Sequence, residues 1–333
     1  MRVLITGVAG FLGSHLADRF LALGHEVVGV DNMIGGNVSN IPEGVIFLQF
    51  DCCDIENMKM AMTDVELVVH AAATAHEGLS VFSPSFITRN IYEASVATIS
   101  AAISSGVKRF IFCSSMARYG NGKPPFKETD ATSPVDPYGI AKVAAEETLK
   151  VLADVHGMEY NIVVPHNIIG PRQNYTDPYR NVLSIMLNRS LLKKPIYIYG
   201  DGEQIRCFSY VDECVESIEK VCFDTTIQSQ VINIGPDSGE VTINELANLV
   251  LNETGSNLTP IHIDGRPQEV KYAYCSSMKA RQLLGYEQKT TLPEAIAETA
   301  NWIRTQGPAE FSYKYPLEII TEKTPKTWSE RKM

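Results

Sequence analysis

Residues 2–13 of this 333-residue chain read RVLITGVAGFLG, an apolar run followed by three glycines at a spacing of three. The run 2–5 predicts a buried parallel strand, and the glycines allow a sharp turn into a helix over 11–23, which ends at Gly24. Such a turn lets the backbone approach a pyrophosphate, whose charge is stabilised by the helix N-terminus. The stretch therefore predicts an α/β domain with a dinucleotide site. Its candidate contacts are Gly7, Gly10, Phe11, Leu12 and Gly13.

An acidic residue follows the second predicted strand, EVVGV at 26–30. A carboxylate at Asp31 can accept hydrogen bonds from the ribose of an adenosine and repels a 2′-phosphate. No arginine follows directly, because positions 32–34 are Asn, Met and Ile. The pattern predicts NAD rather than NADP.

The rest of the chain alternates between predicted strands and predicted helices. We expect strands over 45–50, 65–70, 108–114 and 160–164, and helices over 91–106 and 138–157. This order predicts a doubly wound parallel sheet of the Rossmann type. After position 170 turns become denser, with helices expected over 181–193 and 212–223 and a strand over 196–199. We therefore expect an NAD-binding domain over 1–170, to which later segments return, a smaller substrate-binding lobe over 171–304, and a tail over 305–333 of unassigned role.

Composition narrows the class of protein. Hydrophobic residues make up 44% and charged residues 20%, as in an ordinary globular protein, and the net charge is −10. A negative chain is a poor general binder of nucleic acid or of an anionic membrane surface, and no apolar run is long enough for a membrane span. Seven cysteines without a CxxC pair favour a reducing cytoplasm over a disulfide framework or a metal site. The first strand begins at the first residues, so we expect no signal peptide.

A second motif, a tyrosine followed by a lysine, indicates a catalytic site for proton transfer. Tyr138 and Lys142 are four residues apart, so a helix places them on one face. A free tyrosine has a pKa of about 10, and we expect the positive charges of Lys142 and an oxidised nicotinamide to lower it. Tyr138 can then take a proton from a substrate hydroxyl while hydride leaves the same carbon. Ser115, at the end of a predicted strand, is placed to hydrogen-bond that oxygen. These three residues are the catalytic candidates.

Together the motifs resemble a known family. TGVAGFLG at 6–13, HAAA at 70–73, SSMARYG at 114–120, PYGIAK at 137–142, PHNIIGPRQ at 165–173, GDGEQIRCFSYVDE at 200–213 and GRPQEV at 265–270 are similar to extended short-chain dehydrogenases/reductases, and among them to nucleotide-sugar epimerases. The resemblance runs from Val3 to about Tyr286. It implies cofactor contacts from Asp31, Asn32, Asp51, Cys52, Ala71, Ala72, Ala73, Asn90, Tyr138, Lys142 and Pro165. It also implies that Asn167, Arg206 and Arg266 bind a sugar diphosphate.

The subclass rests on a missing acid. Dehydratases of this family carry a carboxylate two or three residues after the serine, whereas here Met116, Ala117 and Arg118 follow it. The resemblance therefore implies an NAD-dependent 4-epimerase of a UDP-hexose, acting through a transient 4-keto sugar on UDP-GlcNAc/GalNAc, UDP-Glc/Gal or both. Ala273 corresponds to a size gate in these enzymes, and its small side chain leaves room for an N-acetyl group. Arg118 is either a cation of the pocket or a surface charge.

Two other function classes are compatible with the sequence. One is a different nucleotide-sugar enzyme of the same fold: a 4-ketoreductase, a uronic-acid epimerase or a dehydratase. The other is a non-catalytic NAD-binding interaction module, which would be expected to have lost Ser115, Tyr138 or Lys142. The resemblance also implies a homodimer through helices near 91–105 and 138–154, although their small residues could equally pack on the sheet.

Overall fold

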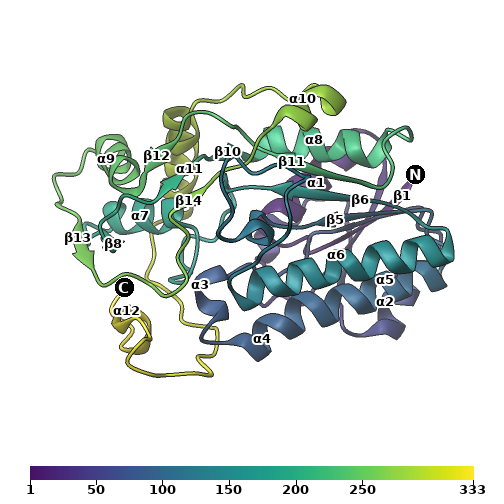
Figure 1. Ribbon diagram of the computed structural model, residues 1–333, viewed down its shortest axis with the longest axis horizontal. Coiled ribbons are helices and arrows are strands. Elements are labelled where there is room, and N and C mark those ends of the chain that lie inside the picture. The colour runs from purple at the N-terminus through teal and green to yellow at the C-terminus, as the bar shows by residue number, and fades with distance from the viewer.

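A seven-stranded parallel sheet forms the centre of the molecule, which is described over residues 1–333 by a computed structural model (Figure 1). The strand order is β11-β6-β5-β4-β1-β2-β3, and every pair is parallel. The predicted doubly wound Rossmann sheet is confirmed. The strands are β1 (Arg2–Thr6), β2 (Glu26–Asp31), β3 (Ile46–Gln49), β4 (Leu67–His70), β5 (Arg109–Cys113), β6 (Glu159–Pro165) and β11 (Gln230–Ile234).

Helices cover both faces of this sheet (Figure 1). On one face α1 (Phe11–Ala22), α8 (Val211–Phe223) and α10 (Met278–Leu284) bury one apolar cluster, and on the other α2 (Ile55–Ala61), α5 (Ala94–Ser104) and α6 (Pro137–His156) bury a second. Successive strand residues point to opposite faces, so Val3 and Ile5 belong to the first cluster and Leu4 to the second. Central strands buried on both faces explain the continuous apolar runs of the sequence.

The helix expected over 91–106 begins earlier than predicted. Helical backbone starts at Pro84, as α4 (Pro84–Thr88), continues as a π-helical turn (Arg89–Glu93) and then becomes α5. Proline is well suited to the first helical turn because its missing N–H has no partner there in any case. A π turn inserts one residue and moves the apolar positions out of the 3.6-residue period. The apolar pattern of the sequence therefore predicted only the part of the helix that follows this turn.

A smaller lobe lies beyond the carboxyl ends of the strands. Its core is a third apolar cluster between α7 (Val182–Leu191), α9 (Ile243–Thr254) and α11 (Leu292–Gln306). Capping boxes begin two of these helices, with Thr242 and Glu245 at α9 and Thr291 and Glu294 at α11. Short strands complete the lobe: β7 (Ile168–Ile169) with β10 (Ser209–Tyr210), β8 (Tyr197–Tyr199) with β13 (Ile261–Ile263), and β9 (Ile205–Arg206) between β12 (Val241–Thr242) and β14 (Tyr272–Ala273).

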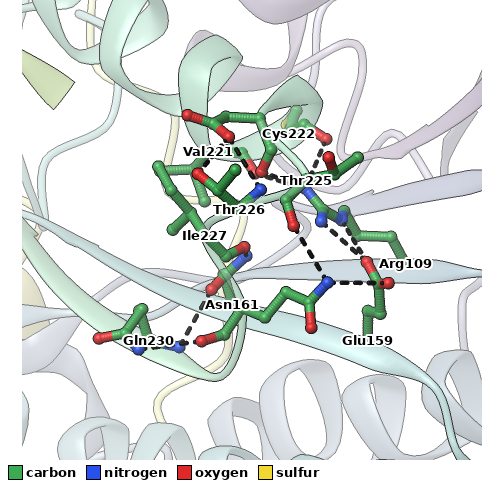
Figure 2. Close-up of polar contacts among 11 residues, drawn as sticks. Arg109, Glu159, Asn161, Val221, Cys222, Thr225, Thr226, Ile227 and Gln230 are labelled. Atoms are coloured by element: carbon green, nitrogen blue, oxygen red, sulfur yellow. Dashed lines mark hydrogen bonds and ion pairs between the residues drawn. The ribbon is translucent and has the colours of Figure 1, made fainter. Parts of the chain in front are cut away.

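The chain returns from the lobe to the sheet through α8 and β11. Figure 2 shows the polar cluster at that return, in which buried Arg109 of β5 donates to three carbonyls at the end of α8 and is paired with Glu159 at 2.8 Å. A cation at the C-terminus of a helix satisfies its free carbonyls. Asn161 of β6 bonds the Ile227 carbonyl and the Gln230 N–H, at the start of β11. These contacts hold β11 in register at the edge of the sheet.

The remaining elements are short: the 3₁₀ turns Val38–Asn40 and Met116–Tyr119, α3 (Glu77–Ser80) after β4, and α12 (Lys326–Ser329) near the C-terminus. All seven cysteines are free. None of the helices combines the length and the apolar character that crossing a bilayer requires.

Candidate active site

One large cavity, of about 890 Å³, lies between the carboxyl ends of the strands and the lobe. This is where ligands bind in open parallel sheets. Every site residue expected from the sequence lines it except Ala273. The lining residues are Gly7, Gly10, Phe11, Leu12, Gly13, Asp31, Asn32, Asp51, Cys52, Ala71, Ala72, Ala73, Asn90, Ser115, Tyr138, Lys142, Pro165, Asn167, Arg206 and Arg266.

The glycine turn forms one end of the cavity. Gly7 has φ +73°, and a Cβ there would lie 2.8 Å from the Ala72 Cα, so only glycine fits between β1 and β4. A Cβ on Gly10 would meet a single atom, the Gly7 carbonyl oxygen, at 3.1 Å. No side chain caps the N-terminus of α1, so its amide groups are left for an anion. The open cradle fits the pyrophosphate of a dinucleotide.

Two carboxylates stand beside this cradle. Asp31, at the end of β2, accepts the N–H groups of Ala9 at 3.1 Å and Met33 at 2.8 Å. Burial raises its pKa, and these two hydrogen bonds oppose the rise. Asp51 accepts the Cys53 N–H at 2.9 Å and is paired with Arg89 at 3.2 Å. Acceptors at these two positions suit the ribose and adenine portions of NAD.

The three catalytic candidates meet near the middle of the cavity. Ser115 follows β5 and accepts the Ala117 N–H at 3.2 Å. Tyr138 and Lys142 lie on α6, whose N-terminus is capped by Asp136 accepting the Gly139 N–H at 2.8 Å. Both side chains are buried, at 5% and 2% exposure. The sequence spacing therefore places the phenol and the ammonium where the β5 and α6 segments converge.

The electrostatics of this group differ from the expectation. Burial raises the pKa of Tyr138, and the nearby Glu77 carboxylate adds to the rise, while the Ser115 hydroxyl opposes it. Burial lowers the pKa of Lys142 to about 8. The Lys142 ammonium donates to the Cys113 carbonyl at 2.7 Å. In the protein alone the pKa of Tyr138 is therefore raised and not lowered, because desolvation is the largest effect. The expected lowering by Lys142 together with an oxidised nicotinamide stays a prediction.

The far end of the cavity carries the predicted diphosphate ligands. Asn167 has φ +45°, and its amide donates to the Cys207 carbonyl at 2.8 Å. Arg206, in β9, donates to the Val270 carbonyl at 2.8 Å. The guanidinium of Arg266 lies 4.6 Å from the centre of the Tyr199 ring and is paired with Glu269 at 2.9 Å. Arg206 of β9 and Arg266, in the loop between β13 and β14, both line the cavity, and guanidinium groups are well suited to bind one anionic group together.

The size-gate expectation for Ala273 has no support in this geometry. Ala273 lies in β14 beside Arg206, but its side chain is 7% exposed and belongs to the apolar cluster on the α6 face of the sheet. It does not line the cavity. The spacing from Arg266 found the correct strand, but the alternation of side chains along that strand turns this one inwards.

Arg118 is neither a pocket cation nor a surface charge. It is 3% exposed and pairs with Glu146 of α6, itself fully buried, at 2.8 Å. It also donates to the Tyr119 hydroxyl at 3.1 Å, and Ser114 donates to the other oxygen of Glu146. The ion pair joins the segment after β5 to α6, directly behind Ser115 and Lys142.

Several polar residues of the cavity were not expected. His76 and Glu77 follow β4, Asp177 and Arg180 precede α7, and Tyr315 belongs to the C-terminal segment. The His76 Nε2 and the Asp177 carboxylate are 2.6 Å apart, and both residues are buried. None of these residues carries a spacing signal, because loops from distant parts of the chain bring them together.

Comparison with known proteins is consistent with this geometry. A model of the NAD-dependent epimerase/dehydratase family matches residues 3–235. The chain belongs to this family. A putative UDP-glucose 4-epimerase of Methanocaldococcus jannaschii is 30% identical, covering 92% of this chain and 99% of its own. A UDP-N-acetyl-α-D-glucosaminuronate decarboxylase of Bacillus cytotoxicus is 31% identical, covering 91% of this chain and 98% of its own.

Among solved structures, a UDP-glucose 4-epimerase of Thermotoga maritima with UDP-glucose superimposes with a TM-score of 0.87. It is 32% identical and covers 92% of this chain and 99% of its own. The fold, the membership of the extended short-chain dehydrogenases/reductases and the cofactor NAD are therefore confirmed. The chain is an enzyme of the nucleotide-sugar epimerase and decarboxylase group.

Proposed function

We propose that this chain is a UDP-hexose 4-epimerase that acts through a transient 4-keto sugar. The observation that supports it most is that Ser115, Tyr138 and Lys142 line the same cavity as Arg206 and Arg266. Tyr138 offers a base for a substrate hydroxyl, and Arg206 and Arg266 offer two cations for a diphosphate. A nucleotide sugar is the substrate class that uses both the base and the cations.

Each residue of the site has its own role in this reaction. Tyr138 removes the proton from the C4 hydroxyl, and Ser115 holds that oxygen by a hydrogen bond. NAD, when bound, supplies the redox chemistry by taking up a hydride and giving it back. Arg206 and Arg266 hold the diphosphate while the 4-keto sugar turns over, so that its other face receives the hydride. Tyr138 then returns the proton to the inverted C4 oxygen.

The charges near the reacting carbon favour a neutral sugar. The carboxylates of Glu77 and Asp136 raise the pKa of Tyr138, and the Arg180 guanidinium lowers it. These charges give no excess of positive charge for a uronic-acid carboxylate. Nothing in the cavity discriminates between a C2 hydroxyl and a C2 N-acetyl group, so both sugar pairs belong to the proposal.

A dehydratase is the second candidate, favoured by Glu77. The segment after Ser115 lacks an acid, but Glu77 lines the cavity from a different loop and affects Tyr138 electrostatically. A carboxyl group there is a possible acid for loss of water. A dehydratase product is lighter by one water, whereas an epimer has unchanged mass.

The test is to incubate the purified protein without added cofactor with UDP-glucose, UDP-N-acetylglucosamine or UDP-glucuronic acid. Proton NMR and mass spectrometry then follow the products. We expect a C4-inverted sugar of unchanged mass from a neutral substrate, and no such product from Tyr138→Phe. Conversion of UDP-glucuronic acid alone, or a product lighter by water, would overturn the 4-epimerase proposal.

A homodimer is part of this proposal. Ala94, Ala101, Ala141 and Ala145 are buried against the protein itself, so these small residues pack inwards. The outward side of α6 instead exposes Ile140 at 55%, Val151 at 61% and Val155 at 70%. Three exposed aliphatic side chains on one helix support an interface there. Light scattering of wild type and Val151→Glu tests it, since only the wild type should have the mass of two chains.

A further inference from the structure

The C-terminal segment, residues 311–333, lies against both parts of the molecule. Figure 1 shows it leaving α11 and passing beside α3 and α4. The Ser312 N–H donates to the Thr176 carbonyl of the lobe at 2.8 Å. The Glu318 carboxylate accepts the N–H groups of Ser85 at 2.9 Å and Phe86 at 2.8 Å, at the N-terminus of α4. This segment is therefore bonded to the lobe and to the NAD-binding domain at once.

Trp328 anchors the end of the segment. Its side chain is 1% exposed and packs edge-on against Phe82, Tyr179 and Tyr199, with ring centres 6.0, 5.2 and 6.4 Å away. These three partners come from the loops after β4 and β7 and from β8. One indole thus packs against three separate segments of the chain, two of which line the cavity at Tyr179 and Tyr199.

The segment also lines the cavity itself, through Lys314, Tyr315 and Met333. The Tyr315 ring lies 4.7 Å from the ring of His76, which in turn is held by Asp177. The wall of the cavity is therefore built partly from the last residues of the chain.

A short path leads from Trp328 to a diphosphate ligand. Tyr199 has its hydroxyl 2.7 Å from that of Thr327 and its ring under the Arg266 guanidinium. A Cβ on Gly78 would lie 3.2 Å from the Trp328 ring and 3.5 Å from an Arg266 nitrogen. Trp328 and Arg266 therefore both lie close to the position that a side chain on Gly78 would occupy, and little free space is left there.

We propose that the segment 311–333 is part of the substrate site, in which Trp328 is a positioning residue that holds Tyr199 and Arg266 in place for the substrate diphosphate. This inference rests on the proposed function, because it assumes a nucleotide-sugar ligand. Residues far beyond the glycine turn and the Tyr–Lys pair then set substrate affinity, although they touch no reacting atom.

The shape of the indole, and not its N–H, is what the site uses. The Trp328 Nε1 is buried and has no hydrogen-bond partner. Phenylalanine at this position keeps most of the aromatic packing and loses no hydrogen bond, whereas alanine leaves a void beside Tyr199. We expect Trp328→Phe to behave like the wild type. We expect Trp328→Ala to bind substrate about tenfold more weakly, equivalent to about 1.4 kcal/mol.

The experiment is titration calorimetry of UDP and UDP-glucose into the full-length wild type, Trp328→Ala, Trp328→Phe and Ile320→Ala. Ile320, in the same segment, is 66% exposed and is the matched control. NAD content by absorbance and thermal melting are recorded for each protein. We expect weaker binding of both ligands by Trp328→Ala only, unchanged NAD content in all four proteins, and in turnover assays a raised KM with kcat within about threefold.

Equal affinity of folded Trp328→Ala and wild type would overturn the inference, as would an equal loss in Trp328→Phe and Trp328→Ala. If Trp328→Ala does not fold, Thr327→Val decides, since it removes only the hydroxyl beside Tyr199. It should weaken UDP binding by about fivefold, the effect of one hydrogen bond, and unchanged binding overturns the inference. A wild type that binds no UDP compound would instead overturn the proposed function, so the two failures are distinguishable.

Discussion

Lys142→Met is expected to stabilise the fold at neutral pH while abolishing turnover. Lys142 is 2% exposed, and burial lowers its pKa from 10.5 to about 8, with Cys113 and Glu146 opposing the change. At 1.36 kcal/mol per pKa unit, this difference corresponds to about 3 kcal/mol of destabilisation at pH 7. Loss of the hydrogen bond to the Cys113 carbonyl removes about 1 kcal/mol, so the net gain is about 2 kcal/mol.

The stabilisation expected from Lys142→Met depends on pH. The pKa of Lys142 is lower in the folded state than in the unfolded state, so folding expels a proton between these two values. The destabilisation is complete below pH 8, declines as pH rises from about 8 to 10.5, and is absent above that range. The advantage of Lys142→Met should therefore be largest at pH 7 and should fade by about pH 10.

Urea denaturation of both proteins at pH 7, 9 and 10, at matched NAD content, measures this difference. Lys150→Met is the control, because Lys150 lies on the same helix and is partly exposed beside Glu147. Its effect on the free energy of unfolding should be small, because an ion pair near the surface contributes little to stability. If Lys142→Met is less stable than the wild type by the same amount at every pH, the reasoning from burial is wrong.

Three further predictions follow from the site. Arg118→Met leaves the fully buried Glu146 unpaired and should lower the free energy of unfolding by about 3–5 kcal/mol. The double variant with Glu146→Gln should recover stability. An unchanged denaturation midpoint in Arg118→Met would contradict the presence of a buried charge at Glu146. Tyr138→Phe should lower kcat about a thousandfold with unchanged UDP affinity, measured by NMR and calorimetry, and near-normal turnover would refute its role as base. Asp31→Asn should reduce the preference for NAD over NADP about tenfold in cofactor-binding assays, because the carboxylate that repels the 2′-phosphate is gone. An unchanged ratio of the two affinities would mean that residues other than Asp31 discriminate between the cofactors.

The parts of the site that sequence patterns predicted are those that follow local rules. The glycines at 7, 10 and 13, the acid at the end of β2 and the i, i+4 pair on α6 each depend on a single turn, strand or helix. Because parallel strands end at the same edge of the sheet, local motifs far apart in the chain also converge on one cavity. The resemblance extended this to the arginines of the lobe, which line the same cavity.

The predictions that failed depended on surroundings. Ala273 was counted from Arg266, but whether a strand residue points into the cavity depends on how that strand lies against its neighbours. The pKa of Tyr138 was judged from the charges of Lys142 and an oxidised nicotinamide, but in the protein alone the largest effect is desolvation, which exists only once the core has closed around it. The role of Arg118 was open because its partner, Glu146, lies on another element.

The sequence by itself determined the fold class, the cofactor and the placement of the candidate pair Tyr138 and Lys142 on one helix, because strands, turns and single helices are specified by residues close together in the chain. Only the tertiary structure decided the buried Arg118–Glu146 pair, the His76–Asp177 contact and the place of the C-terminal segment. These contacts join segments separated by tens to hundreds of residues, and their spacing in the chain carries no period. The effect of such a contact depends on its burial and on its partner residue, and neither can be read from the order of residues in the chain.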